Sequence, residues 1–187
     1  VPAALFMASA ISVLRRELSQ DRSPAPAKVM QNLNRSLWDD LVSSNCFITL
    51  TLICYDPVSH QIWYANAGHI YPLVWSSEML GDADCEPIFL KTRGVPLGIL
   101  PDWKAQAGEL ALSPGHPLLL TSDGLTEATV HTDADKGPAA MLQQTGLWRL
   151  LRAQSQPLNL DDLLQAIQAG SAEQEDDQTA LLLEVTA

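Results

Sequence analysis

The spacing of apolar residues changes after about residue 42, and this change restricts the fold more than any other feature. Up to about residue 42, apolar side chains recur every three or four positions, as on one face of a helix. The spacing predicts a helix over 2–20 and another over 27–42, joined by a polar linker at 21–26 that holds two prolines. Over 46–55 the period becomes two, which is typical of a β-strand. Helices therefore come before strands in this chain.

Turn residues divide the following part of the chain into further elements. Residues 56–59 are typical of a turn, so 46–55 and 61–67 are predicted to pair as an antiparallel hairpin. Apolar runs predict more strands at 71–75, 103–112, 117–122 and 180–185. Helical spacing predicts helices over 138–151 and over a segment that Asn159 caps and Gly170 ends.

Two polar segments without an apolar period, 76–86 and 130–136, are predicted to be mobile surface loops. The order along the chain is helices, several strands, two helices and a final strand. Antiparallel strands with helices grouped apart from them indicate an α+β fold built of layers.

Charge and cysteine content restrict the partners and the setting. The formal net charge of -11 should repel nucleic acids and anionic lipids, so we expect neither as a partner. The three cysteines form no CxxC pair, which fits a reducing, cytoplasmic setting. The longest apolar run, 46–55, is too short to cross a bilayer. The chain opens at Val1 in a helical pattern, so we expect it to be part of a longer protein. Attachment of that protein to a membrane through other segments is left open.

Two acidic points lie at the ends of apolar strands. Asp123 follows the strand at 117–122, and Asp176 with Asp177 precedes the last strand. If these strands are neighbours, the carboxylates converge at one edge and repel each other unless a cation neutralises them. Oxygen ligands suit Mg²⁺ or Mn²⁺, and two such ions can activate a water for phosphate hydrolysis. The alternative, an Asp-Gly turn and a solvated acidic run, stays open at this point.

Six short motifs occur in the order found in one protein family. They are VPAALFM (1–7), NRSL (34–37) with FIT (47–49), YANAGH (64–69), GVPLG (94–98), TSDGLTEA (121–128) and DDQT (176–179). Each motif alone is weak, but the ordered series extends over nearly the whole chain. The chain resembles the bacterial branch of the PPM-type metal-dependent serine/threonine protein phosphatases. That branch includes stage II sporulation protein E and regulators of the general stress sigma factor.

The resemblance implies an antiparallel β-sandwich flanked by helices in α-β-β-α order, with a dinuclear Mn²⁺/Mg²⁺ site at one edge. It implies that a water activated at this site hydrolyses phosphoserine or phosphothreonine on a regulatory protein, an anti-sigma-factor antagonist in this branch. Asp123 and Asp176 fall on two metal ligands of the family, and Asp177 takes a supporting role. The implied partners are the phosphorylated substrate and an upstream sensor or receiver domain, and a dimer is left open. The resemblance assigns no catalytic side chain.

One departure from the family pattern concerns its earlier acidic motifs. In the family they precede the helix that Val1 begins, and one of their Asp residues bridges both metal ions. We therefore expect residues 1–187 to be a single truncated domain that lacks N-terminal strands and is nearly inactive by itself. The first alternative is a phosphatase-like module that has lost catalysis and binds a partner protein. A more remote alternative is another hydrolase with the same layered fold.

Two further residues have both a functional and a structural interpretation. His69 could donate a proton near the site, but ordering of the turn after Gly68 is the favoured interpretation. Glu127 could lie next to the metal ligands or could be a solvated carboxylate, and the sequence favours neither.

Overall fold

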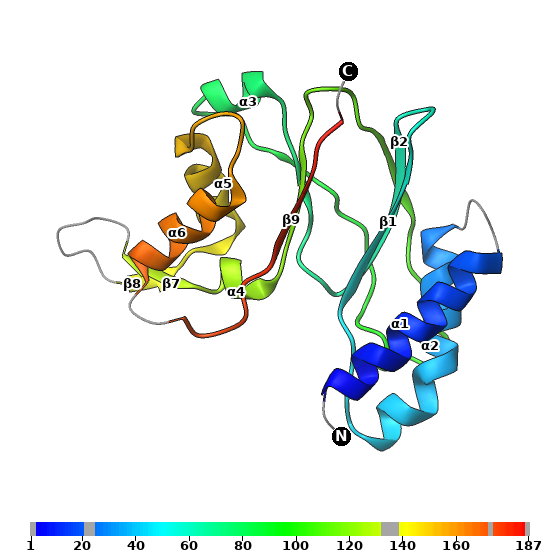
Figure 1. The fold of residues 1–187 in the computed structure, drawn as a ribbon. Helices are drawn as coiled ribbons and strands as arrows, with labels where there is room; N and C mark the ends of the chain where they lie inside the picture. Colours follow the sequence, from blue (N-terminus) through cyan, green and yellow to red (C-terminus); the bar gives the residue numbers. More distant parts are fainter. Residues whose placement is uncertain (1–2, 21–24, 132–138, 172–173, 186–187) are drawn as a thin grey trace. The chain divides into compact units, whose positions relative to one another are not determined.

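The computed structural model describes residues 3–20, 25–131, 139–171 and 174–185, which form two compact units. The first unit takes in residues 1–71 and 90–113, and the second takes in 72–89 and 114–187. Each unit is an antiparallel sheet with helices packed against it (Figure 1). The predicted α+β class is confirmed. No helix in the described ranges is long and apolar enough to span a membrane.

The first unit consists of two helices and a sheet in the order β1-β2-β5. Its elements are α1 (Ala3–Gln20), α2 (Pro26–Ser43), β1 (Leu50–Asp56), β2 (Gln61–Ala67) and β5 (Gly108–Ala111). The predicted hairpin is confirmed, because β1 pairs with β2 from Leu50↔Ala67 to Asp56↔Gln61. The apolar face of α2 is buried against the sheet, with Leu33, Leu37 and Leu41 almost fully covered. The four-residue spacing of these leucines thus determines how α2 packs.

Three of the motifs in the first unit hold one another in place. The side chain of Asn34 accepts a hydrogen bond from Gly98 N (2.8 Å) and donates one to Leu100 O (3.0 Å). Asn66, 2% exposed, accepts from His69 N (2.8 Å) and donates to His69 O (2.8 Å). A Cβ atom on Gly94 would lie 2.0 Å from Asn66 O, so only glycine fits there. These motif residues therefore build the turns of the unit.

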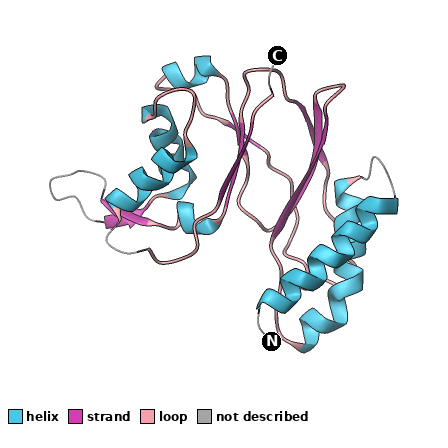
Figure 2. Cartoon of the chain, viewed as in Figure 1, coloured by secondary structure: helices cyan, strands magenta, loops and turns pink. Residues whose placement is uncertain are grey.

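The second unit is a sheet in the order β4-β3-β6-β9 with helices and a short two-stranded ribbon (Figure 2). All neighbouring strands in this sheet are antiparallel. Its strands are β3 (Leu73–Val74), β4 (Ile88–Phe89), β6 (Leu118–Thr121) and β9 (Ala180–Leu183), and the ribbon is β7 (Thr129–His131) with β8 (Ala139–Met141). The helices are α3 (Ser77–Gly81), α4 (Asp123–Thr126), α5 (Gln143–Ala153) and α6 (Leu160–Gly170).

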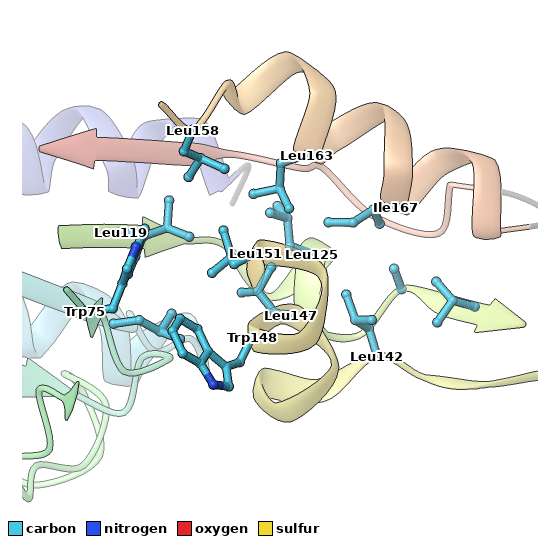
Figure 3. Close-up of a cluster of buried hydrophobic side chains, with 13 residues drawn as sticks. Trp75, Leu119, Leu125, Leu142, Leu147, Trp148, Leu151, Leu158, Leu163 and Ile167 are labelled. Atoms are coloured by element: carbon cyan, nitrogen blue, oxygen red, sulfur yellow. The ribbon is translucent and has the colours of Figure 1, made fainter. Parts of the chain in front are cut away.

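The core of the second unit lies between its sheet and the helices α5 and α6. Leu119 from β6, Leu147 and Leu151 from α5, and Leu163 and Ile167 from α6 point toward one another (Figure 3). All five are at most 1% exposed. The predicted cap of α6 is confirmed, since Asn159 Oδ1 accepts a hydrogen bond from Asp161 N at 2.8 Å. Burial of this apolar face fixes α5 and α6 against β6.

Two loop predictions are wrong in part, because each segment contains residues of a helix or strand. Residues 76–86 contain the helix α3, and its Met79 and Leu80 pack against the core of the second unit. Val130, expected in a mobile loop, is buried in β7 at 9% exposure. Residues 132–136 of that predicted loop lie outside the described residues, as do 21–24 of the predicted linker.

Several predicted element boundaries also change, among them the strand expected over 46–55, which is observed as β1 (Leu50–Asp56). The helix expected over 138–151 begins only at Gln143, because residues 139–141 form β8 and pair with β7. Of the strand expected over 103–112, only Gly108–Ala111 form a strand, which is β5. Of the strand expected over 71–75, only Leu73–Val74 form one, which is β3. Trp103 is instead a buried core residue whose Nε1 donates to Val95 O at 2.6 Å.

Candidate functional site

The pairing of β6 with β9 brings the two acidic points to the same end of one sheet. The register runs from Leu118↔Leu183 to Thr121↔Ala180, so the end of β6 meets the start of β9. Asp123 lies two residues past β6, and Asp176 lies four residues before β9. The neighbouring strands that the sequence argument required are confirmed.

Beyond the paired strands, the backbones of the two acidic segments are in contact. A Cβ atom on Gly124 would lie 2.4 Å from Asp177 O and 3.3 Å from the carbonyl carbon of Asp176. The side-chain amide of Gln178 also donates to Gly124 O at 3.3 Å. Figure 1 shows α4, which begins at Asp123, beside the segment that leads into β9. Glycine after Asp123 is thus needed for close approach of the segment that carries Asp176.

Ser122 links the two segments through three hydrogen bonds. Its N–H donates to Thr179 O at 2.9 Å. Its hydroxyl oxygen accepts from Thr179 N at 2.9 Å, and the hydroxyl donates to Asp177 O at 2.9 Å. Sequence analysis did not identify this role, since a Ser before Asp-Gly is typical of a helix cap. The only available signal was its place in the TSDGLTEA motif.

The carboxylates of Asp123 and Asp176 are exposed and each accepts one local hydrogen bond. Gly124 N donates to Asp123 Oδ1 at 3.1 Å, and Asp177 N donates to Asp176 Oδ1 at 2.7 Å. Within the described ranges, neither carboxylate forms an ion pair with Lys, Arg or His. The side chain of Asp177 is also exposed and makes no hydrogen bond to another described residue. The carboxylates therefore have oxygen atoms available to a cation.

These side chains fit part of the ligand set of a hard divalent cation. Mg²⁺ and Mn²⁺ prefer oxygen ligands and retain several waters, so one or two exposed carboxylates suit them. Among the residues that the structure describes, however, no three His, Cys, Asp or Glu side chains cluster so that they could hold an ion. Asp123 and Asp176 thus offer two carboxylates to an ion, and the described residues add no third side chain beside them.

Glu127 and His69 take positions that the structure defines. Glu127 is exposed at the end of α4, and its N–H donates to Asp123 O at 2.7 Å. His69 belongs to the first unit. The Asn66 side chain forms hydrogen bonds with both the N–H and the carbonyl of His69, and the Nδ1 atom of His69 lies 3.2 Å from Thr49 Oγ1. This bonding supports the interpretation of His69 as a residue that orders the turn.

Comparisons with known proteins connect the chain to one family. The family model for stage II sporulation protein E (SpoIIE) matches residues 1–186. Phosphoserine phosphatase RsbU of Bacillus subtilis (strain 168) is 33% identical over 102 residues, which is 54% of this chain and 29% of RsbU. Phosphoserine phosphatase RsbP of the same organism is 28% identical over 132 residues, which is 69% of this chain and 31% of RsbP. The chain thus spans about three tenths of the length of these relatives.

Solved structures share the fold at low sequence identity. The SiaA-PP2C domain of Pseudomonas aeruginosa superposes with a TM-score of 0.79 at 21% identity, covering 99% of this chain and 71% of that one. The phosphatase domain of SpoIIE from Bacillus subtilis gives a TM-score of 0.60 at 16% identity, covering 95% of this chain and 73% of that one. These likenesses establish the fold, and the family model establishes the relationship. This chain therefore belongs to the stage II sporulation protein E (SpoIIE) family.

Proposed function

We propose that this chain is part of a metal-dependent phosphatase that hydrolyses phosphoserine or phosphothreonine on a regulatory protein. The observation that carries the proposal is the pairing of β6 with β9, which sets the Asp123 turn against the Asp176 segment. A pair of exposed, unpaired carboxylates on adjoining strand ends is a favourable place for a divalent cation. Membership of the SpoIIE family supports the choice of phosphate hydrolysis among the reactions that such a cation could assist.

In this proposal Asp123 and Asp176 hold Mn²⁺ or Mg²⁺, and further ligands come from outside the described residues. Bound ions would supply a water nucleophile and would offset the negative charge of the phosphoryl group. The chain's own contribution is to place two carboxylates at fixed positions. One lies just after β6 and the other in the segment that leads into β9, while the contact of Gly124 with Asp177 sets their spacing. The carboxylate of the adjacent Asp177, which has no hydrogen-bond partner among the described residues, would orient a water that the ion retains.

The proposed substrate is a small phosphorylated regulator of the anti-sigma-factor-antagonist type. The support is the similarity to RsbU and RsbP, both named phosphoserine phosphatases. We also propose that both units belong to one phosphatase domain. In the same proposal, the domain works in the cytoplasm and is preceded by a sensor or receiver domain. A net charge of -11 would disfavour an acidic protein surface around the phosphorylated residue.

A second candidate is a phosphatase-like module that binds a protein without catalysis. The observation that favours it is the number of ligands, because no described cluster holds three metal-binding side chains. The two candidates differ in one measurable respect. A binding module would not need a divalent ion, whereas the proposed phosphatase requires one.

The test is hydrolysis of a phosphoserine peptide by the full-length protein, with Mn²⁺ and with excess chelator. We expect turnover that needs Mn²⁺ and that Asp123→Asn abolishes with little effect on folding, since removal of one charge relaxes carboxylate repulsion. Asp39→Asn, which alters an exposed carboxylate on α2, is the control and should retain activity. Normal turnover by Asp123→Asn at limiting Mn²⁺ would count against the phosphatase.

A further inference from the structure

We propose that Ser122 is a positioning residue that fixes Asp176 relative to Asp123, a role that rests on the metal site proposed above. Ser122 touches neither ion nor substrate in this account. It acts through the backbone of residues 177–179, to which all three of its cross-segment hydrogen bonds go.

The hydroxyl of Ser122 takes the place of a backbone carbonyl in the β6–β9 ladder. In an antiparallel ladder, a hydrogen-bonded pair exchanges two N–H···O bonds. Ser122 and Thr179 lie one position beyond the last strand pair, and the first bond, from Ser122 N to Thr179 O, is present. The carbonyl of Ser122 instead turns into α4, where it accepts from Leu125 N at 3.3 Å. Thr179 N therefore donates to Ser122 Oγ at 2.9 Å.

The same hydroxyl also holds the residue next to Asp176. Its proton goes to Asp177 O at 2.9 Å, so one oxygen atom binds the chain on both sides of Gln178. Among the described residues, the segment is also joined to the Asp123 turn by the backbone bond from Ser122 N to Thr179 O and by the longer side-chain bond from Gln178 to Gly124 O, at 3.3 Å. Loss of the hydroxyl would thus remove the two shorter side-chain bonds that keep Asp176 in place.

Ser122 occupies the cap position of α4 but does not cap that helix. Its side chain makes no hydrogen bond to the first turn of α4. The Ser122 hydroxyl therefore does not stabilise the start of α4. We expect substitution to change the geometry between the two carboxylates more than it changes the stability of the unit.

The experiment measures the dissociation constant for Mn²⁺ by calorimetry on the full-length protein. Ser122→Ala should weaken Mn²⁺ binding about tenfold, the lower end for residues that orient metal ligands. Ser122→Thr keeps the hydroxyl and should restore most of the affinity. Ser76→Ala is the matched control, because it removes a hydroxyl that does cap a short helix of the same unit, accepting from Met79 N at 3.4 Å. It should leave the affinity unchanged.

A second readout needs no metal. In the metal-free protein, the amide of Thr179 should exchange faster in Ser122→Ala than in the wild type or in Ser76→Ala. If Ser122→Ala does not fold, Ser122→Cys keeps the shape of the side chain but forms weak hydrogen bonds, and it should show the same two changes to a smaller extent.

Two results would contradict the proposal, and they can be told apart. If Asp123→Asn and Asp176→Asn weaken Mn²⁺ binding but Ser122→Ala and Ser122→Cys do not, the positioning role is wrong and the metal site stands. If the wild type binds no Mn²⁺, or Asp123→Asn binds it equally well, the proposed function fails and the role of Ser122 fails with it.

Discussion

Gly124 and Ser122 stand on either side of Asp123, and both contact the segment that carries Asp176. The carboxylates themselves make few contacts, since each is exposed and accepts one local hydrogen bond. The position of one carboxylate relative to the other therefore depends on Gly124, which allows the two segments to approach closely, and on Ser122, whose hydroxyl binds the second segment.

Gly124→Ala should disrupt the site by steric overlap. The new Cβ would meet Asp177 O at 2.4 Å, and because this is backbone, the whole segment must move. We expect a loss of about 1–3 kcal/mol in the free energy of unfolding, as for overpacked cores, and at least a tenfold loss of Mn²⁺-dependent activity. Gly81→Ala is the control, since nothing lies within 4 Å of its added Cβ. Equal behaviour of the two variants, measured by denaturant unfolding and by phosphatase assay, would refute the steric argument.

Asp176 and Asp177 should differ in their effect on metal dependence. Asp176 lies at a bend and its Oδ1 accepts a hydrogen bond from Asp177 N, whereas the side chain of Asp177 has no hydrogen-bond partner among the described residues. Asp176 is therefore the carboxylate with the more fixed position. We expect Asp176→Asn to raise the Mn²⁺ concentration needed for half-maximal activity far more than Asp177→Asn does. Equal effects, or the reverse order, would show that the assignment of the ligand is wrong.

The meeting of the Asp123 and Asp176 segments could be predicted from the sequence, but the contacts that hold the two segments together could not. Asp123 and Asp176 stand out because one follows an apolar run and the other precedes one, and a strand end is a place that sequence period reveals. The role of Ser122 depends on the register Thr121↔Ala180, which joins residues far apart in the chain. No local pattern around Ser122 carries that information.

At the scale of elements, α5 organises the second unit by contacts on two sides. Its leucines enter the core, and its polar donors hold the chain that follows α3. Trp148 Nε1 donates to Cys85 O at 2.9 Å, and Arg152 donates to Leu80 O at 3.2 Å and to Ala83 O at 2.9 Å. Residues 80–86 are thus tied to a helix and not free in solvent.

Trp148→Phe should destabilise the protein more than Trp75→Phe does. Both rings belong to the same core, with their centroids 6.2 Å apart, so the two substitutions remove similar apolar bulk. Trp148 Nε1 has a partner, whereas the buried Nε1 of Trp75 has none among the described residues. Trp148→Phe leaves Cys85 O without its donor, and we expect it to cost about 1–2 kcal/mol more. Urea unfolding measures the difference, and a larger loss in Trp75→Phe would contradict the hydrogen-bond account.

Sequence period predicted the long elements but missed the helix α3 and the ribbon β7–β8. The helix α2 and the hairpin β1–β2 each repeat their pattern over seven or more residues, and both were predicted. The helix α3 has five residues, and its cap pairs Ser76 with the thioether of Met79, which is not a usual capping partner. The ribbon β7–β8 has three residues in each strand. Elements this short are fixed by tertiary packing, which local spacing does not contain.

At the scale of the whole molecule, the two units divide the motifs between them. The first unit contains the interlocked turns around Asn34 and Asn66, and the second contains both proposed metal ligands. Since the described residues supply two carboxylates and no third ligand, a complete site needs more than they provide.

Residues 1–187 by themselves should be nearly inactive. With two protein ligands for a site that is proposed to hold two ions, Mn²⁺ would be bound weakly. We expect almost no hydrolysis of a phosphoserine peptide at millimolar Mn²⁺, compared with clear turnover by the full-length protein. Robust turnover by residues 1–187 would show that the described carboxylates suffice.

The central claim is that Asp123 and Asp176, from different strands, bind the same ion. A double-mutant cycle on Mn²⁺ binding to the full-length protein tests it most directly, with Asp123→Asn, Asp176→Asn and the double variant. If both ligate one ion, each substitution weakens binding at least about tenfold, and their free-energy effects are strongly non-additive because residues that share a partner are coupled. If either substitution leaves the dissociation constant unchanged, or if the two effects simply add, the carboxylates do not form one metal site.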